Sequence, residues 1–141
     1  MRDITNHINI RPAIPPAAAI TDNTVLTTSI LDLQGFGSAC LAIGTGVLLS
    51  TAATFAVALF EADDLAFTTG SAVNAIDMNG TTALAGFNQA ADNLCFKIGY
   101  CGNKRYIRAT VTPTGNNAGA PISAVWILGH PAFVPTANPP V

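Results

Sequence analysis

The placement of proline constrains the fold of this chain more than any other feature. Seven of the nine prolines lie near the two ends: Pro12, Pro15, Pro16, Pro131, Pro135, Pro139 and Pro140. Proline fixes φ and lacks an N–H donor, so a proline-rich segment cannot form a central strand of a hydrogen-bonded sheet. We therefore expect extended or irregular chain over residues 11–19 and 131–141, and regular structure between them.

Short runs of β-branched and aromatic residues fill the middle of the chain, separated by Gly, Asn and Asp. This pattern is typical of a β-sandwich or a barrel. We predict an all-β fold, either an antiparallel, jelly-roll-like β-sandwich or a barrel. The predicted parts are an extended N-terminal arm over residues 1–22, a β-sandwich domain over residues 23–130 and a C-terminal arm over residues 131–141.

The expected strands differ in how clearly the sequence marks them. The clearer ones cover residues 25–33, 39–49, 55–61, 94–100, 104–112 and 122–128, and weaker ones cover 65–68, 72–77 and 82–87. Cys101-Gly-Asn103 joins two clear strands, and its Gly and Asn suit the positive φ of a tight turn, so we predict a β-hairpin there. A helix is expected at most over residues 86–92, as a single turn.

Composition favours a protein that is held among neighbours. Only 10% of the residues are charged and 50% are hydrophobic. A neutral surface is easily desolvated, and charge is depleted at the centre of protein interfaces, although many small residues also suit an ordinary monomer. The net charge of −2 gives no footprint for nucleic acid. No run reaches the roughly 20 apolar residues that span a bilayer, and no signal peptide is evident, so neither nucleic acid nor a membrane is an expected partner.

Catalytic and metal-binding residues do not form a recognisable motif. The two histidines, His7 and His130, have no supporting nucleophile or base nearby in sequence. Cys40, Cys95 and Cys101 match no metal-ligand spacing; we expect buried, reduced thiols, although a bond between Cys95 and Cys101 is geometrically conceivable. We therefore predict no enzyme, no metal and no cofactor.

Charged residues gather in two short segments. Glu61, Asp63 and Asp64 are expected to form a solvated turn, because they lack the ligand spacing of a calcium loop. Four of the six basic residues fall within twelve positions: Lys97, Lys104, Arg105 and Arg108. We expect these cations to lie on a strand face and to pair with acidic groups, of this chain or of a neighbour.

The final third of the chain resembles a known family. The segments that carry the resemblance are Lys97 to Gly115 (KIGYCGNKRYIRATVTPTG) and Ala124 to Pro131 (AVWILGHP), with further similarity at Ser29 to Phe36 and Ala56 to Asp64. They resemble small virion proteins of tailed bacteriophages. The resemblance implies a structural protein of the virion and carries over no catalytic residue. Within the virion we expect a head decoration or cement protein, located on the capsid exterior after synthesis in the host bacterial cytoplasm.

We expect such a protein to form a homotrimer and to bind the major capsid protein, stabilising the assembled shell by mass action. The residues expected to contact partners are Ile4, Ile8, Ile10, Arg11, Ile14, Lys104, Arg105, Phe133 and Val134. Two alternatives stay open. One is a ring protein at the head-to-tail connector or tail, and the other is a host glycan-binding module that would need Tyr100, Tyr106 or Trp126 exposed as stacking platforms.

Overall fold

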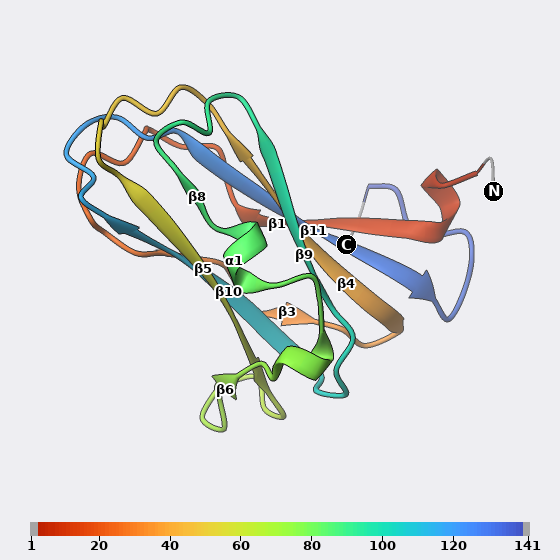
Figure 1. Cartoon of the computed structure of the whole chain (residues 1–141). Helices are drawn as coiled ribbons and strands as arrows, with labels where there is room; N and C mark the ends of the chain where they lie inside the picture. The colour runs from red at the N-terminus through yellow and green to blue at the C-terminus, as the bar shows by residue number, and fades with distance from the viewer. Residues whose placement is uncertain (1–2, 140–141) are drawn as a thin grey trace.

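The computed structural model describes residues 3–139 and shows two antiparallel sheets packed face to face as a sandwich (Figure 1). The predicted all-β fold is confirmed, and the architecture is the sandwich of the two predicted alternatives. The sandwich follows from the alternation of side chains along each strand, which sends one set into the space between the sheets.

The first sheet has five strands, and its outer face becomes important below. In order across the sheet they are β1 (Ile8–Ile14), β11 (Ile122–Pro131), β4 (Phe36–Thr45), β9 (Cys95–Tyr100) and β7 (Met78–Asn79). Along β4, Leu41 and Ile43 are buried between the sheets, whereas Cys40 and Ala42 are only half-buried on the outside. This sheet therefore has a distinct inner and outer face.

The second sheet faces the first across the core. Its strands are β2 (Leu26–Thr27), β10 (Tyr106–Thr114), β5 (Thr54–Ala62) and β6 (Ser71–Ala72), with β3 (Leu31–Asp32) paired to β10 and β8 (Phe87–Asn88) paired to β5. The largest fully buried side chains include Trp126, Tyr100 and Phe55, and they come from both sheets. The alternation predicted along residues 104–112 is confirmed, because Ile107, Ala109 and Val111 are buried.

Helical structure is limited to short turns. The 3₁₀ turns are η1 (Thr5–His7) and η2 (Ala75–Asp77), and the α-helical turn is α1 (Thr82–Ala85). Residues 82–87 were expected to form a strand, and this is wrong because the Thr81 side chain caps α1 by accepting the N–H of Leu84. Residues 86–92 form no helix. None of the helices within residues 3–139 is long and apolar enough to cross a membrane.

Three further predicted strands are shortened or absent. Residues 65–68 form a turn, because the Asp64 carboxylate accepts the N–H groups of Thr68 and Thr69. Residues 25–33 form only β2 and β3, because Thr28 between them accepts the Ala109 N–H with its side chain and not with its backbone. Of residues 72–77, only the start continues the two-residue strand β6.

The predicted hairpin at residues 101–103 is wrong, because the flanking strands belong to different sheets. β9 pairs with β4 and β7, whereas β10 pairs with β5, β2 and β3. The buried Tyr100 hydroxyl organises the crossing: it donates to Glu61 Oε2 at 2.6 Å and accepts the Lys104 N–H at 3.0 Å. Gly102 is needed here, because a Cβ at that position would lie 2.5 Å from this hydroxyl.

The two ends of the chain form one structure. β1 is an edge strand that pairs with β11, so residues 8–14 of the predicted extended N-terminal arm belong to the sheet, with Pro12 tolerated at its edge. The Thr136 hydroxyl donates to the carbonyl oxygens of Thr5 and Ile8, and its N–H donates to Asn6. We call residues 3–10 and 129–138 together the terminal tongue, which projects from one end of the sandwich (Figure 1).

We predict that the substitution Tyr100→Phe destabilises the fold. Removal of the Tyr100 hydroxyl leaves the half-buried Glu61 carboxylate and the Lys104 N–H without their shared hydrogen-bond partner, which lowers the free energy of unfolding by about 1–3 kcal/mol. Burial and the Glu61 hydrogen bond raise the pKa of Tyr100 above its ordinary value. The wild-type protein should therefore lose stability as the pH rises above about 10, where the unfolded tyrosine ionises.

Urea unfolding at several pH values measures both effects. The Thr110→Val variant, on the outer face of the second sheet, serves as a control with an unaltered crossing. A Tyr100→Phe protein with wild-type stability at pH 7, or with the same loss of stability above pH 10, would contradict the proposed role of the hydroxyl.

Candidate binding surface

The outer face of the five-stranded sheet is built from small and aliphatic side chains. The strand register places Ile10 beside Ile127, Ile127 beside Cys40, and Cys40 beside Gly99. The next row runs Pro12, Val125, Ala42 and Lys97. Paired residues of antiparallel strands project from the same face, so these rows form a continuous surface. Ile10 is 45% exposed and Val125 is 39% exposed, so the surface is open to solvent.

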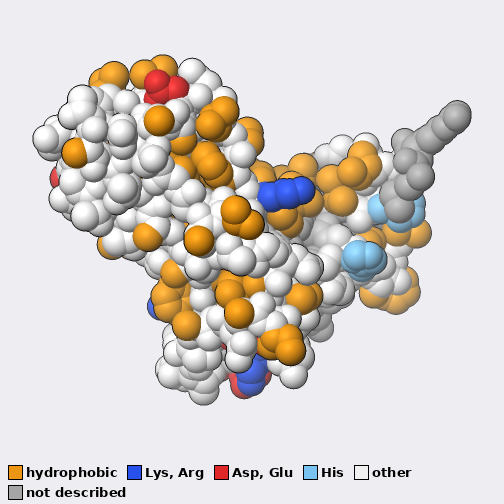
Figure 2. Space-filling model, in the orientation of Figure 1, with side chains coloured by type: hydrophobic (Ala, Val, Ile, Leu, Met, Phe, Trp, Pro, Cys, Tyr) orange, Lys and Arg blue, Asp and Glu red, His pale blue; other side chains and the backbone are white. Residues whose placement is uncertain are grey.

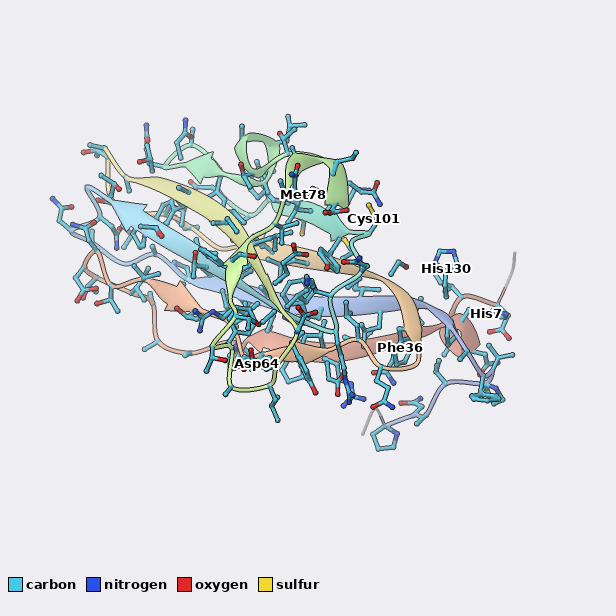
Figure 3. The ribbon with its side chains drawn as sticks, turned by 90° about the horizontal axis from the view of Figure 1, so that it is seen from below. His7, Phe36, Asp64, Met78, Cys101 and His130 are labelled. Carbon is cyan, nitrogen blue, oxygen red and sulfur yellow. The ribbon has the colours of Figure 1, made fainter. Side chains whose placement is uncertain are left out.

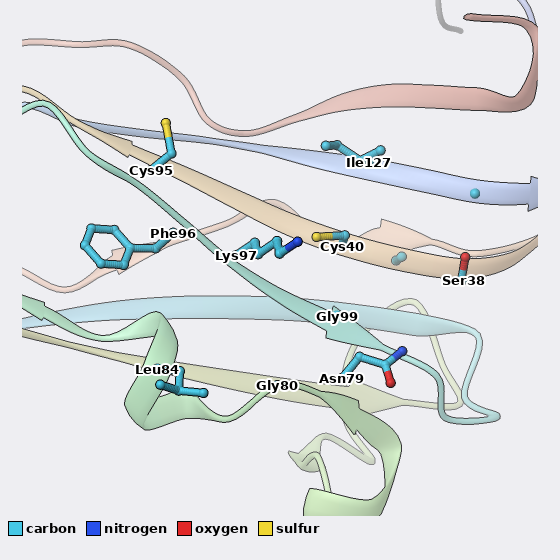
Figure 4. Close-up of a pocket in the computed structure, with 12 residues that line it drawn as sticks. Ser38, Cys40, Asn79, Gly80, Leu84, Cys95, Phe96, Lys97, Gly99 and Ile127 are labelled. Atoms are coloured by element: carbon cyan, nitrogen blue, oxygen red, sulfur yellow. The ribbon is translucent and has the colours of Figure 1, made fainter. Parts of the chain in front are cut away.

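This surface contains a groove with a volume of about 670 Å³. Its walls come from four strands and from α1, and they include Ile127, Cys40, Lys97, Asn79 and Leu84 (Figure 4). Lys97 is the charged residue among those that line the groove. Its ammonium makes no ion pair with a carboxylate of residues 3–139. The groove is therefore mainly apolar, with one cation available to a ligand or partner.

The three cysteines are free, and they differ in exposure. Cys95 and Cys101 are exposed, so the expectation of buried thiols is wrong for these two residues. Cys40 is half-buried, and burial raises the pKa of its thiol, although the charge of Lys97 acts in the opposite direction. Figure 4 shows the Lys97 side chain extending toward Cys40 in the groove.

The terminal tongue carries most of the residues expected to contact partners. Phe133 is 86% exposed, Ile4 63% and Val134 55%, so these side chains are free to bind another molecule. Ile8 and Arg11 are half-buried, and the Arg11 Nε donates to Asn9 Oδ1 at 2.9 Å. Ile14 does not fit its expected role, because it lies in the hydrophobic core.

The basic pair Lys104 and Arg105 lies far along the chain from its acidic partners but next to them in the fold. Lys104 forms a salt bridge with Asp63, and Arg105 forms a bidentate one with Asp32 at 2.8–2.9 Å. Arg105 holds the pKa of the Asp32 carboxyl below its ordinary value. Of the four clustered cations expected to lie on a strand face and pair with acidic groups, Lys104 and Arg105 do pair within the chain, although both precede β10. Lys97 and Arg108 make no ion pair with a carboxylate of residues 3–139. Contact of Lys104 and Arg105 with partners stays a prediction.

The aromatic residues suggested as glycan platforms are not available. Trp126 is 0% exposed, Tyr100 1% and Tyr106 9%, so the condition that the glycan-binding alternative placed on them is not met. Trp126 alternates with outward residues on β11 and points into the core, where its large apolar ring is most stabilising.

The sequence did not predict that a serine and a histidine, Ser38 and His130, lie within hydrogen-bond distance of each other. Ser38 Oγ lies 2.8 Å from His130 Nδ1, across the pairing of β4 with β11 (Figure 3 labels the histidine). A serine nucleophile needs a base that a third group holds in place, and His130 makes no other side-chain hydrogen bond among the described residues. In the same part of the chain, no three His, Cys, Asp or Glu side chains converge on a metal site.

Comparison with known proteins supports the fold and goes no further. No family profile and no curated protein matches the sequence. Among solved structures, the PBSX exported protein XepA is similar with a TM-score of 0.56 and 12% identity, over 94% of this chain but only 40% of that protein. The chain therefore spans less than half the length of XepA, and at this identity the likeness shows the fold alone.

Weaker similarities are to carbohydrate-binding modules. A xylan-binding domain of family 22 gives a TM-score of 0.44 at 12% identity, covering 91% of this chain and 89% of that domain. A family 35 module from Clostridium thermocellum gives 0.45 at 10% identity, covering 87% and 91%. Nothing about the ligands of this chain follows from matches at these scores.

We predict two fast thiols and one slow thiol in the native protein. Cys95 and Cys101 are exposed, whereas burial of Cys40 hinders access and disfavours its thiolate. Titration with a chromogenic disulfide should release about two equivalents quickly and the third slowly, with all three fast in denaturant. The slow phase should vanish in Cys40→Ser; a wild-type Cys40 that reacts as fast as Cys95 would refute this view of the groove.

Proposed function

We propose that this chain is a non-enzymatic structural protein of a phage particle, a decoration or cement protein that binds the outside of the head. The observation that carries the proposal is the combination of two apolar surfaces, the groove and the terminal tongue, on one rigid sandwich. Monomeric proteins seldom expose several large aliphatic and aromatic side chains together unless they bind a partner. The resemblance of residues 97–115 and 124–131 to virion proteins supports the same class.

The chemistry required of a cement protein is association alone. A protein that binds the assembled shell, but not the separated subunits, stabilises the shell by mass action. The sparse charge of this chain lowers the cost of desolvating its contact surfaces, since only 10% of its residues carry charge. The capsid protein and further copies of the chain, as a homotrimer at symmetry axes, are the proposed partners.

A ring protein at the head-to-tail connector or tail is the second candidate, and the tongue favours it equally, because a projecting segment also suits contacts around a ring. The two candidates differ in copy number, since a head surface offers on the order of hundreds of equivalent sites whereas a ring uses about six to twelve.

Add-back to depleted particles tests the proposal. We expect purified chain, mixed with heads assembled without it, to bind at on the order of hundreds of copies per particle and to raise the temperature at which the heads open. Quantitative mass spectrometry counts the copies and calorimetry follows opening. About six to twelve copies would indicate the ring instead, and no binding to either heads or tails would overturn a role in the virion.

A further inference from the structure

The groove on the five-stranded sheet is suited to an apolar segment of protein and poorly suited to a sugar. Its one aromatic wall residue, Phe96, stacks on Phe87 at 5.0 Å and so is already engaged within the chain. Ile127, Leu84 and Cys40 give it aliphatic and sulfur surfaces. Its volume of about 670 Å³ lies in the range of pockets that enclose a drug-sized ligand, which is room for a few side chains.

The terminal tongue has the complementary properties. Phe133, Val134 and Ile4 stand exposed at its surface, and Phe133 is the most exposed of the large hydrophobic residues described. Asp3, next to Ile4, accepts hydrogen bonds from Asn6 and pairs with no cation of residues 3–139. The tongue thus offers apolar side chains beside a carboxylate, and the groove offers apolar walls beside the ammonium of Lys97.

The tongue is also held in shape before it binds. Thr136 ties the C-terminal half of the tongue to the carbonyl oxygens of Thr5, Asn6 and Ile8 in the N-terminal half. Ala132 donates to the carbonyl of Gly35 at 2.8 Å, which fixes the chain just before Phe133. A segment ordered in advance loses less entropy on binding, so even a small apolar contact gives useful affinity.

The two surfaces lie on one molecule and adjoin at Gly129, which lines the groove and begins the C-terminal half of the tongue. Figure 2 shows the molecule hollowed between the body of the sandwich and the end that carries the termini, with hydrophobic side chains along the hollow. The tongue continues from β1 and β11, whose pairing of Ile8 with Gly129 holds it at the end of the sheet. The tongue therefore extends beyond the end of the sheet, where its exposed side chains Phe133 and Val134 can contact another molecule.

From this complementarity we propose that the groove on the outer face of the five-stranded sheet receives the terminal tongue of a second copy of this chain. Phe133 and Val134 enter the apolar part, and Asp3 of one copy lies opposite Lys97 of the other. Because each copy has both surfaces, two copies related by a two-fold axis make the contact twice, and other rotations join copies head to tail. The proposed contact forms between copies of the free protein, so its test does not depend on the proposed place in a virion.

Two variants that damage opposite halves of the contact provide the test. Phe133→Ser removes the most exposed part of the tongue. Ile127→Asp puts a carboxylate into the apolar wall of the groove, where it is desolvated by Phe133 and competes with Asp3 for Lys97. Each should weaken self-association by at least about tenfold, the loss typical of an aromatic anchor or of a charge desolvated in an apolar contact. Thr112→Asp, on the outer face of the other sheet, is the matched control and should associate as the wild type does.

Sedimentation velocity from about 1 μM to about 1 mM measures association over the range of a weak interface. Mixing the two variants should restore one intact contact per pair, because the groove of Phe133→Ser and the tongue of Ile127→Asp are both undamaged. The mixture should therefore associate more strongly than either variant alone, although less strongly than the wild type where the contact is made twice. All of these positions are exposed or half-buried, and circular dichroism with thermal unfolding checks that each variant folds.

Two results would overturn the inference. One is wild-type protein that stays monomeric up to about 1 mM, a concentration at which even millimolar affinity is visible. The other is a mixture of the two variants that associates no better than either alone. If Phe133→Ser instead lowers only the binding to heads in the add-back assay, the tongue binds the capsid protein; the proposed function then survives and the contact between copies does not.

Discussion

The buried hydroxyl of Tyr100 is the polar link on which the arrangement of the two sheets depends. It ties β9 of one sheet to Glu61 on β5 of the other and also receives the Lys104 N–H at the crossing between them. A buried phenol needs partners, because an unsatisfied polar group in the core costs about 1–3 kcal/mol. The partners that satisfy it therefore fix where the chain changes sheet, and Lys104 continues the link to Asp63 at the surface.

Sequence reasoning predicted the long central strands well, because burial and alternation coincide in them. Residues 55–61 lie within β5, and residues 122–128 lie within β11. It failed at residues 101–103, where Gly and Asn marked a turn correctly but could not show which strands the turn joins. Turn chemistry is local, whereas the choice of sheet is set by long-range contacts such as that of Tyr100 with Glu61.

The two parts of the binding surface differed in how far the sequence revealed them. The apolar residues of the tongue could be predicted, since Phe133 and Val134 lie between Pro131 and Pro135, which limit regular pairing. The joining of the two ends through Thr136 could not be predicted, because it depends on contacts between distant parts of the chain. The groove could not, because β4 and β11 carry apolar residues on both faces and so lack the alternation that separates a buried face from an exposed one. Ile14 was predicted to contact a partner because it lies among prolines. The pairing of β1 with β11 instead places it in the hydrophobic core.

The scarcity of charge ties the fold to the proposed association. Of the six basic residues, Lys104 and Arg105 are engaged within the chain, and Arg108 lies over the ring of Phe67 at 4.5 Å. These contacts hold loops and crossings in place, and they leave the outer face of the five-stranded sheet with Lys97 as a cation without an intrachain partner among residues 3–139. A surface with so little charge costs little free energy to desolvate, yet one unpaired ammonium can still select the orientation of an acidic partner.

Weak contacts of this kind become effective when many copies are held side by side, because each bound copy raises the local concentration for the next. The regular shell of the proposed function would provide that condition, so the sparse charge and the apolar tongue are consistent with the proposed association on a lattice.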